Sequence, residues 1–238
     1  QFLIIISGER SALFYFIFSS FFIFIFVKNF KKIKIFTFLF SISMFVLVLF
    51  FNSEVKHRII TLTLIELGYE QEINLSNLLD KKDKTDLHFF SSHHTNHYTS
   101  ALKMFKQNML FGVGVKNFRV KCKEAQFRSS ETGVFCSSHP HNTYLQLMAE
   151  TGLVGLIYIL SLVIIFFFYL YKHILFSKKK SIFFLNFEIC LMASILITLW
   201  PFVPTGNFFN NWLNVFFHIP IGLIIWSNKN SNFTNIRF

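Results

Sequence analysis

Five apolar stretches constrain the fold of this 238-residue chain more than any other feature of its sequence. The hydrocarbon core of a bilayer is about 30 Å thick, and a helix crosses it with roughly 17 to 25 apolar residues. Stretches of this kind occupy residues 11–27, 35–51, 153–171, 182–200 and about 208–226. Only the fourth contains a charged residue, Glu188. We therefore expect an all-α polytopic membrane protein with about five transmembrane helices.

The composition agrees with lipid as the solvent of these stretches. Hydrophobic residues make up 53% of the chain, which includes 36 Phe, more than a soluble domain needs for one core. The net charge of +11 does not indicate a nucleic-acid partner, because most of the excess flanks the apolar stretches. The chain begins with Gln1 inside an apolar run. We interpret it as a fragment that lacks upstream helices.

The charges between the stretches predict which ends of the helices face the cytoplasm. If the five spans alternate in direction, the basic connections and the basic tail share one side, and the positive-inside rule makes that side the cytoplasm. These basic residues are Lys28, Lys31, Lys32, Lys34, Lys172, Lys178, Lys179, Lys180, Lys229 and Arg237. Residues 7–10, 201–210 and the long loop 52–150 are then expected on the outer side.

The long loop is expected to be partly helical and to belong to a single membrane domain spanning residues 1–238. An amphipathic pattern predicts a short helix over residues 99–107, which ends before the Phe-Gly-Val-Gly turn at residues 111–114. Residues 80–86 are typical of a solvated turn. Apolar residues from Asn142 onward predict one helix that runs from the loop into the third span, with His141 near its N-terminus.

Two of the three cysteines, Cys122 and Cys136, share the outward loop and lie 14 residues apart. Outside the cytoplasm, such a pair favours a disulfide bond over two free thiols. In the chain-entropy account, closing a loop of this length stabilises the fold by about 3 kcal/mol. The bond would fasten the glycine turn to the segment that carries His139 and His141.

The sharpest motif in the chain is His141-Asn142, followed after nine residues by Gly152-Leu-Val-Gly155, at a junction between loop and membrane helix. This motif resembles the signature of the O-antigen ligase and O-antigen polymerase superfamily. The wider segment Ser-His-Pro-His-Asn-Thr-Tyr-Leu-Gln-Leu-Met-Ala-Glu-Thr-Gly, residues 138–152, is similar to it throughout. Ser-Gly-Glu-Arg at residues 7–10, Arg58, Leu-Lys-Met-Phe at residues 102–105 and the turn at 111–114 extend the resemblance over most of the chain.

The resemblance implies a metal-independent, inverting glycosyltransferase without a cofactor, in the bacterial inner membrane. Such an enzyme moves a glycan from an undecaprenyl-pyrophosphate-linked donor to an acceptor hydroxyl, such as that of lipid A-core, on the periplasmic face. Alternatives within the class are a polymerase of O-antigen repeat units and a protein O-oligosaccharyltransferase.

His141 suits the role of catalytic base, because a sugar hydroxyl needs a positioned group that takes its proton and histidine titrates near neutrality. His139 competes for this role, but His141 begins the nine-residue spacing. A helix N-terminus also disfavours the imidazolium and attracts phosphate oxygens. The alternative for His141 is a capping or surface histidine.

Cations must meet the charge of the departing pyrophosphate, and Arg10 and Arg58 lie at the outward ends of spans. The alternative for both is anchoring at the membrane interface. Many family members carry an Arg about eight residues before Leu102, where this chain has His94, so His94 or His97 is a candidate replacement. Asn142 and Glu150 complete the candidates for substrate contact, and for Glu150 a structural role is equally open.

Two further readings compete with these. His93 and His97 lie four residues apart and could share a helical face as metal ligands, but no cysteine or placed carboxylate completes such a site. Glu188 would be costly in lipid and predicts, in a different class of protein, a flippase or transporter of lipid-linked glycans. In that class of protein, Glu188 rather than His141 would carry the function.

Overall fold

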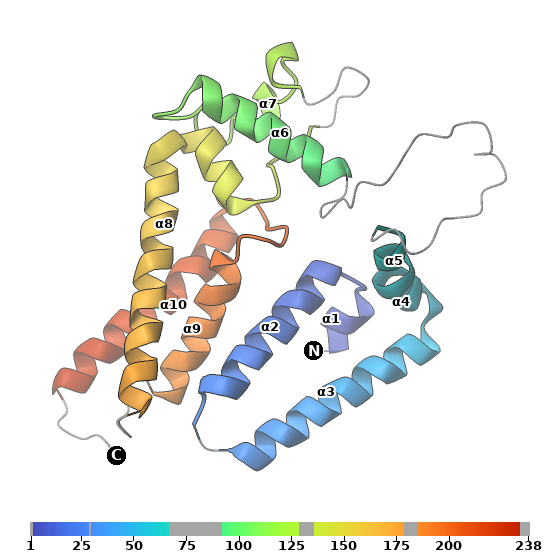
Figure 1. Cartoon of the computed structure of the whole chain (residues 1–238), viewed down its shortest axis with the longest axis vertical. Helices are drawn as coiled ribbons and strands as arrows, with labels where there is room; N and C mark the ends of the chain where they lie inside the picture. Colours follow the sequence, from blue (N-terminus) through green and yellow to red (C-terminus); the bar gives the residue numbers. More distant parts are fainter. Residues whose placement is uncertain (1, 29, 67–91, 129–135, 179–184, 234–238) are drawn as a thin grey trace. The chain divides into compact units, whose positions relative to one another are not determined.

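The computed structural model describes residues 2–28, 30–66, 92–128, 136–178 and 185–233. The expected surface turn at residues 80–86 lies outside them. The chain divides into two compact units, one made of Gln1–Ile17 with Phe30–His93 and the other of Phe18–Asn29 with His94–Phe238. Each unit is described by itself below, with the labels of Figure 1.

The first unit is built around a long apolar helix and a run of short helical turns that follows it. It contains α1 (Phe2–Ile6), the start of α2 (Arg10–Phe26), α3 (Lys31–Phe51), α4 (Ser53–Lys56), the π-helical turn η1 (His57–Thr61) and α5 (Leu62–Glu66). The backbone breaks after α3 because Asn52 is extended and its side chain caps α4, accepting a hydrogen bond from the Val55 amide. This break turns the chain from the long helix into the segment that carries Arg58.

The second unit packs three long helices and the end of α2 around one core. The helices are α8 (Thr143–Lys178), α9 (Asn186–Leu199) and α10 (Asn211–Phe233). Each contributes apolar side chains to the buried cluster, which includes Phe22, Ile159, Phe166, Ile189, Met192, Leu196 and Phe217. The buried side chains of α9 recur at the spacing of one helical face, which is why this helix lies between its neighbours.

A second, smaller core lies at the end of α8 where the chain enters it. Figure 1 shows α6 (Ser92–Gln107) and α7 (Phe118–Lys121) across this end of α8, followed by the short 3-10 turn η3 (Ala125–Phe127). Ala101, Met104, Phe118, Phe127 and Ala149 are buried together there. This small core positions the loop segments against the start of α8.

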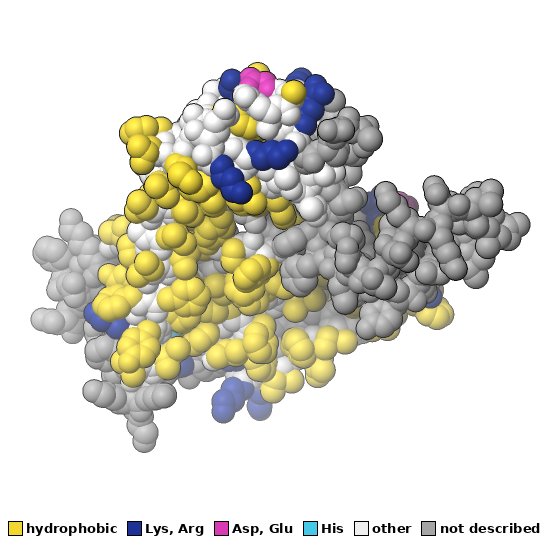
Figure 2. Space-filling model, turned by 45° about the horizontal axis from the view of Figure 1, so that its top comes forward, with side chains coloured by type: hydrophobic (Ala, Val, Ile, Leu, Met, Phe, Trp, Pro, Cys, Tyr) yellow, Lys and Arg dark blue, Asp and Glu magenta, His cyan; other side chains and the backbone are white. Residues whose placement is uncertain are grey.

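The long helices are apolar on their outer surface as well as in the core. Figure 2 shows hydrophobic side chains over most of the surface that the helices present, as expected for helices in lipid. Two helices are long and apolar enough to cross a membrane, α3 with 21 residues and the Thr143–Leu175 part of α8 with 33. Three shorter apolar helices, Arg10–Phe26, Asn186–Leu199 and Asn211–Ser227, coincide with the other expected spans. In the part of the chain that the structure describes, the fold is therefore all-helical, with the features of a membrane protein.

Candidate functional site

His141 lies in a tight turn immediately before α8. Its backbone is left-handed, with φ 57°, a conformation that His adopts more readily than bulky or β-branched residues. The His141 carbonyl oxygen accepts a hydrogen bond of 2.9 Å from the amide of Thr205, in the connection between α9 and α10. His141 as a residue is partly exposed, whereas Pro140 before it is buried. The turn therefore holds the backbone of a residue that is not fully buried.

Asn142 caps the N-terminus of α8. Its Oδ1 accepts hydrogen bonds from the amides of Tyr144 and Leu145, at 3.0 and 3.1 Å. Its Nδ2 donates to the carbonyl oxygen of Pro201 at 2.8 Å. All polar atoms of this buried side chain are therefore engaged within the protein. Asn142 fixes where the helix starts, and this capping, not substrate contact, is the role that its hydrogen bonds describe.

Four histidines gather at this turn and form what we call the histidine cluster: His94, His97, His139 and His141. The ring centroid of His141 lies 4.2 Å from that of His139, 5.6 Å from that of His94 and 5.7 Å from that of His97. His94 and His97 come from the first turns of α6, which starts at Ser92, earlier than the sequence predicted. The structure thus brings three candidate residues from two distant segments to one place.

The contacts of His139 separate its role from that of His141. Its Nε2 lies 3.1 Å from the carbonyl oxygen of Thr205 and its Nδ1 lies 2.9 Å from the hydroxyl of Ser138. A carbonyl oxygen only accepts, so Nε2 carries the proton, and in the neutral ring Nδ1 accepts from Ser138. Burial lowers the pKa of His139, and the positive charge of a protonated His141 lowers it further. Both ring nitrogens of His139 therefore have partners within the protein, and these contacts support the turn.

The connection between α9 and α10 provides contacts that the sequence analysis did not find. Thr205 forms hydrogen bonds with three residues of the turn. Its carbonyl oxygen lies 3.1 Å from Nε2 of His139, and its amide donates to the carbonyl oxygen of His141. Its hydroxyl lies 3.0 Å from the hydroxyl of Thr143. Gln146, fully buried one turn into α8, donates to Oδ1 of Asn207 at 2.7 Å and accepts from the amide of Phe208 at 2.9 Å. No local pattern in the sequence predicts hydrogen bonds between segments so far apart. Helical spacing of Asn142 and Gln146 on one face was the only available signal.

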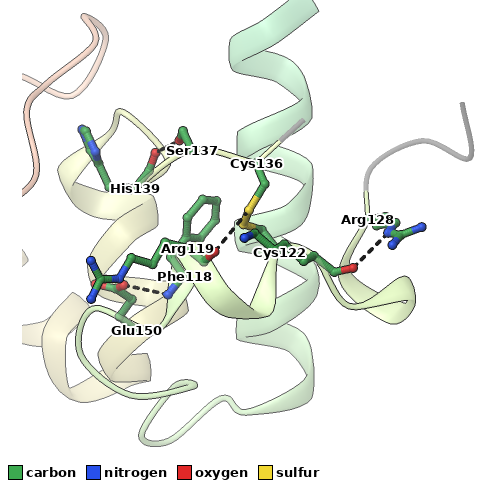
Figure 3. The surroundings of a disulfide bond; sticks show 9 residues. Phe118, Arg119, Cys122, Arg128, Cys136, Ser137, His139 and Glu150 are labelled. Carbon is green, nitrogen blue, oxygen red and sulfur yellow. Dashed lines mark hydrogen bonds between the residues drawn. A yellow bond between two sulfur atoms is a disulfide. The ribbon is translucent and has the colours of Figure 1, made fainter. Parts of the chain in front are cut away.

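Glu150 is fully buried and joins two segments of the loop. One carboxylate oxygen accepts from the amide of Phe118 at 2.9 Å (Figure 3), and the other accepts from Nε2 of Gln146 at 3.0 Å. A buried carboxylate is costly unless such donors satisfy it. Of the two roles that the sequence left open for Glu150, these contacts describe the structural one, because they hold α7 against α8.

Two glycines allow the loop backbone to touch α8 directly. Gly112 and Gly152 both have φ 66°, and α8 is kinked at Gly152. Hydrogen bonds between backbone amides and carbonyls join the segment 109–114 to α8 here. The amide of Val113 donates to the carbonyl oxygen of Ala149 at 2.8 Å, and the amide of Leu153 donates to that of Met109 at 2.7 Å. A Cβ built on either glycine would lie 2.4 to 2.5 Å from backbone atoms of the other segment. This contact, which we call the glycine junction, explains why glycine stands at the end of the nine-residue spacing.

Cys122 and Cys136 are joined by a disulfide bond, with their Cα atoms 5.6 Å apart (Figure 3). Cys122 follows α7 and is buried, and Cys136 opens the segment that leads to His139 and His141. The bond therefore ties the segment before the histidine turn to the small core.

We expect an alkylating reagent to modify these two cysteines only after reduction. The free Cys190 provides the internal control, because it reacts under denaturing conditions whether or not reductant is present. Intact mass after denaturing alkylation should show one adduct without reductant and three with it. Three adducts without reductant would show that the disulfide does not form in the cell.

In the first unit, Arg10 and Arg58 lie on segments that contact each other. The guanidinium of Arg10, at the start of α2, donates to the hydroxyl of Thr63 at 3.3 Å. A Cβ built on Gly8 would lie 3.0 Å from Cδ of Arg58, so the turn before α2 lies against that side chain. Arg58 is half exposed and forms an ion pair with Glu54 at 3.2 Å. Exposed pairs of this kind contribute little stability.

Comparison with known proteins identifies the family. The family model described as O-antigen ligase matches residues 2–160, which include Arg10, Arg58, the disulfide, the histidine cluster and the glycine junction. A search of curated proteins gives no match, and no solved structure matches the chain. The match covers more than half of the chain, and the connection between α9 and α10 lies outside it. The chain belongs to the O-antigen ligase family.

Proposed function

We propose that this protein is a glycosyltransferase that transfers a glycan from an undecaprenyl-pyrophosphate-linked donor to a hydroxyl of lipid A-core, with His141 as general base. The acceptor oxygen attacks the anomeric carbon, and the bond from that carbon to the pyrophosphate breaks. The acceptor proton passes to His141, and undecaprenyl pyrophosphate leaves with the electron pair. One displacement of this kind inverts the anomeric centre.

The observation that carries the proposal is the arrangement of the histidine turn. The backbone of His141 is fixed by Thr205 and by the cap at Asn142, while the residue is partly exposed. A general base must be held in a fixed position and must also be accessible to the substrate.

Cationic and donor groups are available for the pyrophosphate. In the proposal, Arg10 and Arg58 bind its oxygens, as guanidinium groups bind phosphate in a bidentate manner. His94 and His97, whose rings flank His141, supply further donors at the position where family members carry an Arg. No step in this scheme requires a metal ion.

The membrane topology of the proposal has five spans, with the histidine turn on the periplasmic side. The contacts of His139, His141 and Asn142 with Pro201 and Thr205 support one element of it. They require the long loop and the connection between α9 and α10 to lie at the same end of the helices. The lysine-rich connections belong at the opposite end, which the positive-inside rule assigns to the cytoplasm.

The direct test is transfer by the purified protein from a lipid-linked glycan donor to isolated lipid A-core. Formation of glycan-capped lipid A-core supports the proposal, and its absence with an intact, folded protein contradicts it. The glycan profile of a deletion strain then separates the two family activities. Loss of all capping identifies a ligase, whereas capping with single repeat units identifies a polymerase.

The competing transporter function rests on Glu188, and the structure explains that residue in another way. Glu188 lies in the first turn of α9 and is buried. Its Oε2 accepts a hydrogen bond of 2.8 Å from the amide of Leu185, so it caps the helix.

We expect Glu188→Gln to leave glycan-capped lipopolysaccharide within about twofold of the wild-type level, because Gln retains an oxygen that accepts from Leu185. Glu188→Ala removes the cap and should cost about 1 kcal/mol of stability. The measurement is the ratio of capped to uncapped lipopolysaccharide in a complemented deletion strain. Loss of capping in Glu188→Gln at normal protein level would favour a transporter whose carboxylate binds a proton or ion.

A further inference from the structure

A cavity of about 400 Å³ lies beside the histidine turn, within the second unit. Its volume falls in the range of about 300 to 1,000 Å³ that is typical of small-molecule sites. The lining residues come from α7 and the segment before it, from the histidine segment, and from the start of α10 and the connection before it: Lys116, Arg119, Ser138, Asn207, Phe209, Asn210, Asn211 and Trp212. We call this space the basic pocket. The transfer scheme above assigns it no role.

Several polar groups of the basic pocket are cations or donors. Lys116 and Arg119 are exposed, and no salt bridge within 4 Å joins either of them to a residue that the structure describes, although the charge of Arg119 interacts with the nearby Glu150. Oδ1 of Asn207 is occupied by Gln146 and by the amide of Phe209, and Oδ1 of Asn210 is occupied by the amide of Trp212. The group left on each of these asparagines is the amide nitrogen, a donor.

Glu150, a carboxylate beside the pocket, is already satisfied. Figure 3 shows Glu150 next to Arg119, but both oxygens of Glu150 accept hydrogen bonds from within the protein, and the residue is fully buried. The surrounding surface is basic as well: residues 94–128 and 136–150 contain seven cations, Lys103, Lys106, Lys116, Arg119, Lys121, Lys123 and Arg128, and two acids, Glu124 and Glu150. Figure 2 shows Lys and Arg side chains gathered above the apolar helices. A ligand rich in acceptors and carrying negative charge fits this environment.

The aromatic side chains that line the pocket indicate a second property of its ligand. Trp212, the most exposed of the pocket's aromatic side chains at 76%, stands at the start of α10 with Phe209 nearby in the pocket wall. A flat, exposed aromatic face beside amide donors suits a sugar ring, which offers C–H groups on its faces and hydroxyl oxygens at its rim. An inorganic anion would contact Lys116 and Arg119 but would gain nothing from the aromatic side chains.

The pocket is linked to the proposed base through two intervening residues, Ser138 and His139. Ser138 lines it and is hydrogen bonded to His139 at 2.9 Å, and the ring of His139 lies 4.2 Å from that of His141 between centroids. From this arrangement we infer that the basic pocket binds an anionic carbohydrate, a part of the acceptor whose sugars carry phosphate or carboxylate groups. The assignment to the acceptor rests on the transfer function proposed above, whereas the binding of an anionic sugar does not.

Equilibrium binding to the full chain in detergent micelles tests the pocket without any need for activity. The probes share one ring and differ in charge: glucose, glucose 6-phosphate and glucuronic acid, with inorganic phosphate as a fourth. Both anionic sugars should bind more tightly than glucose and more tightly than inorganic phosphate. The double variant Lys116→Ala/Arg119→Ala should weaken their binding by about tenfold or more, as expected for the loss of charge-assisted hydrogen bonds.

The matched control is Lys106→Ala/Lys123→Ala, which removes the same charge from the same basic surface at two exposed residues that do not line the pocket. This control should bind the anionic sugars as the wild type does. Trp212→Ala should weaken glucose 6-phosphate but not inorganic phosphate. Equal binding of glucose and its anionic relatives, equal binding of glucose 6-phosphate and inorganic phosphate, or equal loss in both double variants would each overturn the inference.

A transfer assay then tests the assignment to the acceptor. Lipid A-core that carries sugar phosphates is compared with the same material after phosphatase treatment. Lys116→Ala/Arg119→Ala should raise KM for the phosphorylated acceptor about tenfold while kcat and the KM for the lipid-linked donor stay near wild type. A higher donor KM instead would overturn the acceptor assignment. Absence of transfer with every acceptor contradicts the proposed function and leaves the binding result to stand on its own.

Discussion

His141→Asn is expected to lower kcat for glycan transfer by roughly 10²-fold to 10⁴-fold, the usual contribution of a positioned general base. Asparagine is chosen because the backbone at this position has φ 57°, which Asn also accepts, whereas Ala there would add backbone strain. The turn, its hydrogen bond to Thr205 and the cap at Asn142 should therefore survive the change. The measurement is single-turnover transfer from a lipid-linked donor by the purified variant at matched folded concentration.

His139→Asn is the matched comparison, because it removes the neighbouring imidazole from the same turn. This variant loses the hydrogen bonds to Ser138 and to the carbonyl of Thr205, so it should be less stable. Its kcat should fall by no more than about tenfold, far less than the loss for a missing base. If His139→Asn abolished transfer and His141→Asn retained it, the base would be His139.

The pH dependence of the rate gives a second criterion. A histidine base must be neutral to act, so kcat/KM for the wild type should fall as the pH drops below the pKa of that histidine. The residual activity of His141→Asn should lack this acidic limb, whereas His139→Asn should keep it. A persistent limb in His141→Asn would assign the titration to another group.

Much of the helical architecture follows from the apolar stretches. Each stretch of 17 or more apolar residues coincides with a helix, because an uninterrupted apolar run has few other ways to satisfy its backbone. The fourth was predicted as 182–200, whereas α9 covers Asn186–Leu199, since Glu188 caps the helix start instead of lying inside a span. Whether all five helices cross the membrane remains part of the proposal.

The site could be predicted only where the information is local. The spacing from Asn142 to Gly152 identified the helix start and the glycine, because a cap and a positive φ leave a mark in the sequence. The link from His139 to Thr205, 66 residues away, leaves no such mark. Polar residues at the start of α6, where His94 and His97 lie, gave no apolar periodicity, so that helix was predicted to begin seven residues too late, at 99 instead of 92.

The glycine junction combines a local feature of the sequence, a glycine with positive φ, with a contact between distant segments. A substitution there should affect the stability of the protein most. Gly152 has φ 66° and ψ −148°, a region open almost only to glycine. A Cβ there would lie 2.5 Å from the backbone of Met109 and Leu110, which a side-chain rotation does not relieve. Either α8 straightens or the segment 109–114 separates from it.

Gly152→Ala is therefore expected to destabilise the protein by about 3 kcal/mol or more, combining backbone strain with the clash. For a chain of this size, that lowers the midpoint of thermal unfolding by roughly 6 to 12 °C. The measurement is thermal unfolding of the purified protein in detergent. Gly222→Ala in α10 is the control, because a Cβ there meets no atom within 4 Å and Ala favours a helix.

The partner glycine supplies the decisive comparison. Gly112→Ala should cost a similar amount, since its Cβ would lie 2.4 Å from the backbone of Glu150. Both substitutions break the same contact, so the double variant should lose clearly less than the sum of the two single losses. Additive losses would show that each glycine relieves a separate local strain. Only a shared loss supports the view that the nine-residue spacing exists to dock the loop on α8 and so to place the turn that carries His141.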